Sequence, residues 1–300
     1  MAKDLAAGER LDKHALRPLL QRKDGPASLW LFGHLSLLVL SSLLLWSSLG
    51  SWWLLATLPL QGVILIFLFA PLHESIHGTA FASAWKNRWV GWLCGLLLLL
   101  PPNYFRAFHL THHAHTQNPE RDPELITPKP ETWGQALLYH SGLPYWIAQI
   151  RGLLLAASGR LQGNFITSRS APIIEREARI ALAVYAILAL GSLLLWSGLL
   201  LWLWVLPALI GQPVLRAYLL AEHWDCPKVP DMRANTRTTL TNPAVRFLAW
   251  NMPYHAEHHA YASVPFHALP DLHRLMAPEL KVVSPGYLSV HRAFWARLKF

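Results

Sequence analysis

Two long stretches of this 300-residue sequence contain no Asp, Glu, Lys or Arg, and they restrict its fold more than any other feature. They cover residues 28–72 and 180–215. A helix that spans a bilayer needs about 20 apolar residues. The first stretch therefore predicts two spans joined by a turn at residues 47–51, and the second predicts a shorter hairpin that breaks near residues 191–198. We expect an all-α integral membrane protein with four transmembrane helices in two hairpins.

The composition agrees with a membrane location and argues against nucleic-acid binding. Charged residues make up 14% of the chain, whereas soluble domains carry roughly 25%. The formal net charge is +9, but the 15 Trp and 8 Tyr residues suit the two membrane interfaces, where such rings gather. Only two cysteines are present, with no CxxC pair, which is typical of a reducing compartment.

The positions of the basic residues predict the topology. Every Lys and Arg lies outside the two charge-free stretches, and the positive-inside rule places such segments in the cytoplasm. We expect one membrane-embedded domain, with both termini and the segment between the hairpins cytoplasmic. Its parts would be an N-terminal arm (1–27), a first hairpin (28–72), a middle segment (73–179), a second hairpin (180–215) and a C-terminal cap (216–300).

Two apolar segments in the middle of the chain are poor candidates for spans. Residues 89–100 would form a helix of about 18 Å, which is shorter than the ~30 Å hydrocarbon core. Pro101 and Pro102 should end it, so we expect a re-entrant or interfacial piece. Residues 133–157 carry little charge and are broken by Gly142 and Pro144, which favours an interfacial segment.

Eight of the 16 histidines fall into three groups, HESIH at 73–77, HLTHH at 109–113 and HAEHH at 255–259. On a helix, positions i, i+3 and i+4 share one face. The predicted topology also places all three groups on the same side of the membrane. A single zinc ion takes at most four protein ligands, so the sequence predicts two metals. The candidate ligands are His73, His77, His109, His112, His113, His255, His258 and His259.

In this order, and separated by hydrophobic hairpins, the three groups resemble the histidine boxes of the membrane-bound fatty acid desaturase and hydroxylase superfamily. The resemblance covers roughly residues 50–275. The strings FRAFHLTHHAHTQNPERDPEL and NMPYHAEHHAYASVPFHALPDLH resemble a bacterial subgroup that includes dihydrorhizobitoxine desaturase-like proteins and relatives that form terminal alkenes from fatty acids. The resemblance implies two non-heme irons, O2 as co-substrate, an external electron donor and a cytoplasmic helical cap that holds the di-metal site. Through the bacterial subgroup it also implies a bacterial inner membrane, with the active site on the cytoplasmic side.

His223 is a candidate ninth ligand outside the three boxes. Eight histidines divide unevenly if one metal takes five ligands and the other takes four. Eight helical residues beyond Leu215 would lift His223 about 12 Å above the membrane edge. Members of the resembled superfamily use a further histidine between the second and third boxes, and His223 is the only one between His140 and His255.

Other polar residues near the boxes are candidates for hydrogen bonds to the metal-binding histidines, because a ligating imidazole usually donates its second N–H to a neighbour. Asn251 precedes His255 by one helical turn and can bond a metal-bound water. His115 lies off the shared face of the second box, so we place it behind the ligands or beside the substrate. The carboxylate candidates are Glu74, Asp122, Glu124, Glu222 and Glu257.

The resulting prediction is an O2-dependent di-iron desaturase that acts on a fatty acyl or lipid-like substrate, with no catalytic residue beyond the metal site. Hydroxylation, ketone formation and decarboxylation to a terminal alkene stay open. The sequence has no GxG dinucleotide motif and no CxxC cluster motif, which favours an external ferredoxin and reductase as electron source. A metal or proton transporter is disfavoured, because the charge-free stretches lack the ionisable groups of an ion pathway. A zinc hydrolase would need only about three protein ligands.

Overall fold

The four longest helices are apolar enough to cross a membrane. A computed structural model describes residues 11–300 and is mostly helical. Within these residues the candidate spans are Asp24–Ser47 (α2), Leu54–His77 (α3, Leu54–Ile66, followed by α4, Phe69–His77), Ala171–Leu194 (α9) and Leu201–His223 (η3, Leu201–Val205, followed by α10, Leu206–His223). With 23 or 24 residues each, they are about 35 Å long, which exceeds the ~30 Å hydrocarbon core.

The spans extend beyond the charge-free stretches at several ends. The α9 helix begins at Ala171, nine residues before the second stretch, and α10 continues to His223, eight residues after it. Between the two first spans the chain turns at residues 48–53, as the sequence predicts. The outward faces of α2 and α9 are apolar: Leu43 is 63% exposed and Leu193 is 72% exposed. Such side chains suit contact with lipid.

The α3 and α10 helices cross at a pair of glycines. A Cβ atom on Gly62 would lie 2.7 Å from the carbonyl oxygen of Pro207, and a Cβ atom on Gly211 would lie 2.2 Å from that of Gly62. Glycine at both positions therefore lets the two backbones touch, as small residues do between membrane helices. This crossing joins the first pair of spans to the last one.

The segment between the spans forms five shorter elements, namely α5 (Ala84–Leu97), α6 (Pro102–His115), η2 (Pro123–Leu125), α7 (Trp133–His140) and α8 (Leu143–Ala157). As predicted, the apolar helix α5 ends before Pro101, and Pro102 then begins α6. The segment 133–157 is broken at Gly142, where φ is +72°. Glycine adopts this left-handed conformation without steric cost.

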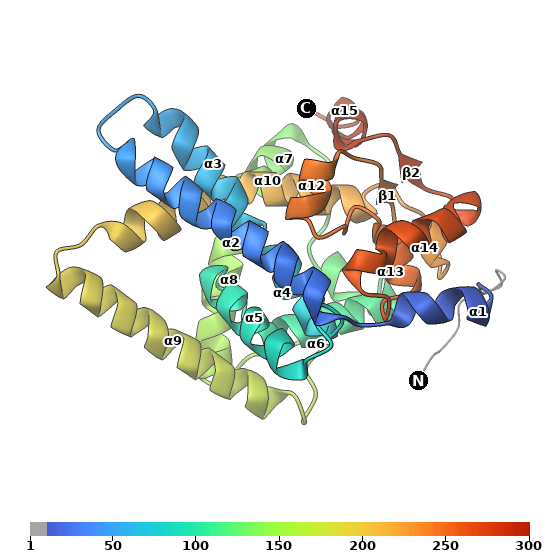
Figure 1. Cartoon of the computed structure of the whole chain (residues 1–300), viewed down its shortest axis with the longest axis horizontal. Coiled ribbons are helices and arrows are strands. Elements are labelled where there is room, and N and C mark those ends of the chain that lie inside the picture. The colour runs from blue at the N-terminus through green and yellow to red at the C-terminus, as the bar shows by residue number, and fades with distance from the viewer. Residues whose placement is uncertain (1–10) are drawn as a thin grey trace.

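The C-terminal part folds onto the ends of α4, α6 and α10. It comprises α11 (Met232–Asn235), β1 (Thr238–Thr239), α12 (Pro243–Leu248), α13 (His255–Ala260), η4 (Phe266–Ala268), α14 (Leu269–Met276), η5 (Ala277–Glu279), β2 (Val283–Ser284) and α15 (Tyr287–Ala296). The two short strands pair in parallel. At the other end of the chain are α1 (Lys13–Leu16) and η1 (Arg17–Leu20). Figure 1 shows α13 and α14 beside α4 and α6, while the turns after α2 and α9 lie at the opposite end of the molecule.

Candidate metal centre

The first histidine pair lies in the last turns of α4. His73 and His77 share one face of this helix, with their ring centroids 5.0 Å apart. Gly78 ends the helix in the left-handed conformation, with φ at +73°, so the chain turns away immediately after His77. The same helix carries Glu74, which is completely buried.

The α6 helix presents His109, His112 and His113. Its N-terminus receives no hydrogen bond from its own cap residue. Instead, the carboxylate of Glu177 on α9 accepts hydrogen bonds from the backbone N–H groups of Asn103 (2.9 Å) and Tyr104 (3.2 Å). A negative charge at this end also interacts favourably with the helix dipole. The third span thereby fixes the helix of the second box.

Two further elements complete the histidine set. The short helix α13 carries His255, His258 and His259, all of them buried. His223 is the last residue of α10 and is 5% exposed. Its carbonyl oxygen accepts a hydrogen bond from the side-chain amide of Gln117 (2.9 Å), which links the end of α10 to the turn after α6.

Five of these histidines form one group, in which each residue offers one ring nitrogen within 4.8 Å of those of all the others. The Nε2 atoms of His109 and His113 are 2.9 Å apart. The members of this five-histidine group are His73, His77, His109, His113 and His258.

The other four histidines lie next to this group. His112, His223 and His259 meet the same 4.8 Å criterion among themselves, and the Nε2 atoms of His112 and His223 are 3.2 Å apart. His255 adjoins them, with its Nε2 atom 3.3 Å from that of His223. We call these residues the four-histidine group. The rings of His113 and His259 stack 4.0 Å apart and so join the two groups.

In the four-histidine group, each Nδ1 atom faces a polar atom of another residue. His112 Nδ1 donates to Asp122 (2.9 Å), and His223 Nδ1 donates to the carbonyl oxygen of Asn235 (3.3 Å). The Thr116 hydroxyl donates to the carbonyl oxygen of His112 (2.8 Å), so its oxygen can accept from His259 Nδ1 at 3.1 Å.

His255 completes this pattern with a longer contact. Its Nδ1 atom lies 3.5 Å from a carboxylate oxygen of Glu222. Nδ1 is hydrogen-bonded in His112, His223 and His259, whereas in His255 it only faces the carboxylate. In all four residues Nε2 is therefore the nitrogen that remains for a metal ion, as in histidine sites where the second nitrogen bonds to the protein.

The five-histidine group has a single carboxylate beside it. Within residues 11–300, Glu74 alone places a carboxylate oxygen within 4 Å of its ring nitrogens, at 3.5 Å from His73 Nδ1 and 3.9 Å from His258 Nδ1. The other Glu74 oxygen accepts from the backbone N–H of Phe266 (3.2 Å). Aromatic side chains pack against the same rings, including Phe105 at 5.2 Å from His109.

The chemistry of these groups suits metal ions. A metal needs neutral imidazoles with a free lone pair. Burial lowers the pKa of His258 to about 3 and also lowers the pKa of His109, His113, His255 and His259 well below the usual value. Within the described chain, both ring nitrogens of His258 and the Nε2 atom of His259 are buried without a hydrogen-bond partner. Unpaired buried nitrogens are costly unless something binds them.

His112 differs from its neighbours in charge. Burial opposes its protonation, but the nearby carboxylates of Glu124 and Asp122 outweigh that effect and raise the pKa of His112. A metal ion bound to His112 would bring positive charge to the same place as the proton of the charged imidazole, beside the same two carboxylates. The acidic residues beside His112 therefore favour a cation at this position.

Some of the polar residues predicted to hydrogen-bond the metal-binding histidines contact them in the structure, and others do not. Asp122 contacts a cluster histidine, as expected, and so do Glu74 and Glu222. Glu257 does not: within residues 11–300 its oxygens accept from Thr238 (2.5 Å) and contact His273. The amide of Asn251 donates to the carbonyl oxygen of Phe266 (3.1 Å), so its bond to a metal-bound water stays a prediction. His115 belongs to neither histidine group.

The sequence reasoning missed Thr116 and Asn235, which both contact histidines of the four-histidine group. Thr116 lies four residues after His112, where a hydroxyl can bond back to the helix carbonyl, so its position on α6 was a usable signal. The backbone carbonyl of Asn235 carries no such signal, because any residue type has one.

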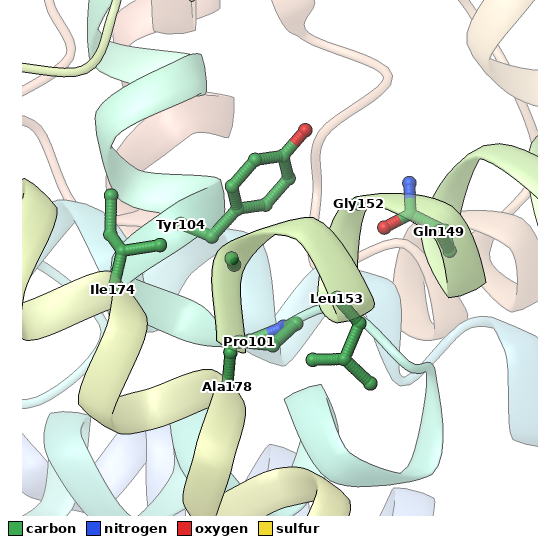
Figure 2. Close-up of a pocket in the computed structure, with 8 residues that line it drawn as sticks. Pro101, Tyr104, Gln149, Gly152, Leu153, Ile174 and Ala178 are labelled. Carbon is green, nitrogen blue, oxygen red and sulfur yellow. The ribbon is translucent and has the colours of Figure 1, made fainter. Parts of the chain in front are cut away.

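A small, partly open pocket lies outside the cluster, between α6, α8 and α9. Tyr104, Leu153, Ile174 and Ala178 line it (Figure 2), together with Pro101, Gln149, Gly152 and Ala156. None of the nine histidines reaches this pocket, and its lining is almost entirely apolar. It therefore adds no polar group to the candidate metal centre.

Comparison with known proteins identifies relatives of the chain. The sequence model of the family described as fatty acid desaturase matches residues 50–291. An sn-1 acyl-lipid omega-3 desaturase (ferredoxin) from Synechocystis is 30% identical over 91 residues, which are 30% of this chain and 25% of that protein. The chain thus aligns with about a quarter of the cyanobacterial protein's length.

Two animal proteins align over most of the chain. A sphingolipid delta(4)-desaturase from Drosophila melanogaster is 24% identical over 83% of this chain and 72% of its own length. A sphingolipid delta(4)-desaturase/C4-monooxygenase from Rattus norvegicus is 24% identical over 96% of this chain and 85% of its own length. The match to the rat protein leaves out only 4% of this chain, so it extends across all three histidine boxes.

Proposed function

This chain belongs to the fatty acid desaturase family, and from that premise we propose that its histidine cluster holds two iron ions and uses O2 to desaturate an acyl chain. Family membership makes the protein an oxidoreductase and, together with the four apolar helices, a membrane protein. The number of metals, their identity, the co-substrate and the substrate are the proposal.

The observation that carries this proposal is the division of nine histidines into adjacent groups of five and four. The carboxylates of Asp122, Glu222 and Glu74 face Nδ1 atoms of these histidines. Glu124 instead faces an Nε2 atom. One ion in each group would be bound by all nine histidines that the sequence predicts as ligands. Imidazole binds iron, copper, nickel and zinc, and the redox chemistry of C–H oxidation favours iron, since zinc has none.

The protein's own residues bind the metal ions and hold the imidazole rings in orientation. Bound iron would supply the redox chemistry that couples O2 reduction to C–H oxidation. Asp122, Thr116 and Glu222 hold the imidazoles in position, and the burial of the rings excludes bulk water. Removal of two hydrogens from neighbouring carbons yields two electrons and two protons. An external donor supplies two more electrons and the solvent two more protons, so that one O2 becomes two waters.

The proposed substrate is a fatty acyl chain or an acyl lipid. The cyanobacterial relative is named for an acyl lipid and the animal relatives for sphingolipids. In this chain the cluster lies at the ends of helices long enough to cross a membrane, which is where an acyl chain held in a bilayer would reach it. The bacterial subgroup named above offers free fatty acids as a further possibility.

Hydroxylation is the second candidate reaction. The relative from Rattus norvegicus is named both a desaturase and a C4-monooxygenase, so a protein similar to this chain is named for both reactions. The two reactions would diverge after the first hydrogen is removed: loss of a second hydrogen gives an alkene, whereas transfer of oxygen gives an alcohol.

We also propose the topology expected from the sequence: two hairpins in a bacterial inner membrane, with the cap and both termini cytoplasmic. The turns at residues 48–53 and 195–198 contain no charged residue, whereas Lys23, Lys86 and Arg176 lie in or near the opposite ends of the spans. This asymmetry supports the proposal through the positive-inside rule. Reporter fusions at residue 50 and after residue 300 should report opposite sides of the membrane.

An external iron–sulfur protein is the proposed electron donor. The Synechocystis relative carries ferredoxin in its name, and the net charge of +9 would attract an acidic carrier. Membranes containing this protein should form product only when a reductase and a ferredoxin are both added. Turnover by the purified chain with NADH alone would contradict this part of the proposal.

The deciding experiment compares lipids and small metabolites of a heterologous bacterial host with and without the gene, by mass spectrometry. A desaturase yields a product that has lost two hydrogens, whereas a hydroxylase yields one that has gained an oxygen. A host carrying the His258→Ala variant is the matched control, because it retains the membrane helices. The same lipid profile in all three hosts would contradict an acyl or lipid substrate.

A further inference from the structure

One short turn places two carboxylates at opposite nitrogens of a single imidazole. Asp122 immediately precedes η2 and accepts from His112 Nδ1 at 2.9 Å. Glu124, inside η2, has its Oε1 atom 3.9 Å from His112 Nε2. Asp122 therefore lies on the Nδ1 side of the His112 ring, which we call its back, and Glu124 lies on the Nε2 side, which we call its front.

The front of His112 is the side on which a metal would bind. Its Nδ1 atom is engaged by Asp122, and its Nε2 atom faces His223 Nε2 at 3.2 Å. Donor atoms lie about 2.0–2.2 Å from a bound ion of zinc's size, so two donors to one ion can be up to about 4 Å apart. The Glu124 oxygen is within this range of His112 Nε2.

A contact between the Glu124 carboxylate and an ion would break no hydrogen bond that the described residues show. Its carboxylate makes no hydrogen bond within residues 11–300, and the side chain is 31% exposed. The backbone is nevertheless fixed, because Glu124 N–H donates to Asp122 (2.9 Å), which also accepts from the backbone N–H of Gln117 (2.8 Å). The turn thus holds the residue in place while its carboxylate can rotate.

We propose that Glu124 is an oxygen donor to the ion of the four-histidine group. That group is one donor short of its neighbour, and a carboxylate would both supply the fifth donor and reduce the net charge of the site. The inference rests on the proposed two-metal function. It makes the two sites chemically different, one with nitrogen donors alone and the other with nitrogen and oxygen.

The test uses the full-length protein in detergent with cobalt(II) as the probe. Wild-type protein should bind two ions per chain. In Glu124→Gln, the weaker of the two dissociation constants should rise about 10–100-fold, the range seen when a group close to a metal site is removed, and the visible absorption of bound cobalt should change. Glu131→Gln, at an exposed carboxylate nearby in the sequence, should match the wild type in both measurements.

A second variant separates direct contact from a general effect of charge. Glu124→Asp keeps the charge but shortens the side chain by one methylene, so it should bind the second ion as weakly as Glu124→Gln does. Wild-type affinity and absorption in either variant would overturn the inference. Fewer than two cobalt ions in the wild type would instead overturn the two-metal proposal, and this inference with it. The far-UV circular dichroism of the metal-free variants should match that of the wild type, since the Glu124 carboxylate makes no hydrogen bond within residues 11–300 that holds the fold.

Discussion

The four-histidine group and the five-histidine group are held in place by different interactions. Each Nδ1 atom of the four-histidine group faces its own polar partner, and these partners come from Asp122, Thr116, Glu222 and Asn235. The five-histidine group has only Glu74 beside it within the described residues, and apolar rings such as Phe105 pack against it. Hydrogen bonds direct a ring's orientation, whereas apolar packing fixes its position without choosing which nitrogen points inward.

This difference predicts how the two groups behave without metal. The four-histidine group should keep its arrangement, because its hydrogen bonds do not depend on an ion. The five-histidine group contains more buried nitrogens without a partner in the described chain, including both of His73 and both of His258, so it should relax more when no ion is bound. The four predictions that follow test this comparison.

The largest effect is expected from removal of a donor. His112→Ala should abolish product formation and metal binding by the four-histidine group, because it removes both a donor and the partner of Asp122. Leu110→Ala, on the same helix but 36% exposed, should retain most activity. Product formation in membranes and metal content per chain measure both variants. Equal loss in the two would mean that the helix as a whole, and not its histidine face, is required.

The second-largest effect is expected when the carboxylate beside one of the two histidine groups is replaced by an amide. Asp122→Asn should weaken metal binding about 10-fold or more, because it removes the charge at 2.9 Å from His112. Glu74→Gln should weaken it less, because its contacts to His73 and His258 are longer, at 3.5 and 3.9 Å. Cobalt retained after dialysis against a chelator measures both. If Glu74→Gln lost more cobalt than Asp122→Asn, hydrogen bonds would not be more important in the four-histidine group than in the five-histidine group.

A smaller effect is expected at Thr116. Thr116→Val keeps the shape but leaves His259 Nδ1 without its acceptor, which should cost about 1–3 kcal/mol of stability. The matched control is Thr111→Val on the same helix, since within residues 11–300 the Thr111 hydroxyl bonds only to the carbonyl of Ala107 (2.9 Å). Denaturant unfolding of metal-free protein in detergent gives the difference. If both variants lose the same stability, the contact with His259 contributes nothing.

The smallest effect is expected at His115. It follows the second box directly but belongs to neither group, and its side chain is only partly buried. His115→Ala should change stability by no more than about 0.5 kcal/mol and leave two metals bound. Loss of one metal ion in this variant would extend the four-histidine group to a further residue.

The membrane helices were predictable because charge is so costly inside a bilayer that its absence marks a span. Their ends were less predictable. The α9 helix starts at Ala171 and includes Glu175 and Arg176, since helical backbone continues past the apolar residues wherever its side chains reach a polar environment. A charge-free stretch therefore indicates the part of a helix that lipid can surround, and not where the helix begins.

The histidine set was predictable from spacing, but its supporting contacts were not. Glu257 stands two residues after His255, and a helix turns about 200° over two residues, so its side chain leaves the histidine face and reaches Thr238 instead. Helical geometry alone could have predicted this. The bond from His223 to Asn235, in contrast, depends on how the loop after α10 folds back, and no local pattern specifies it.

The histidines of the cluster are distributed over most of the chain, from His73 to His259, and this distribution affects how the protein is made. A growing chain exposes His73 and His113 long before the ribosome reaches His258. During that interval an incomplete set of imidazoles is open to any divalent ion, and zinc or copper binds such nitrogens more tightly than ferrous iron does. Synthesis of the third box closes the site, so cells that produce the protein faster than they supply iron should accumulate chains loaded with the wrong metal.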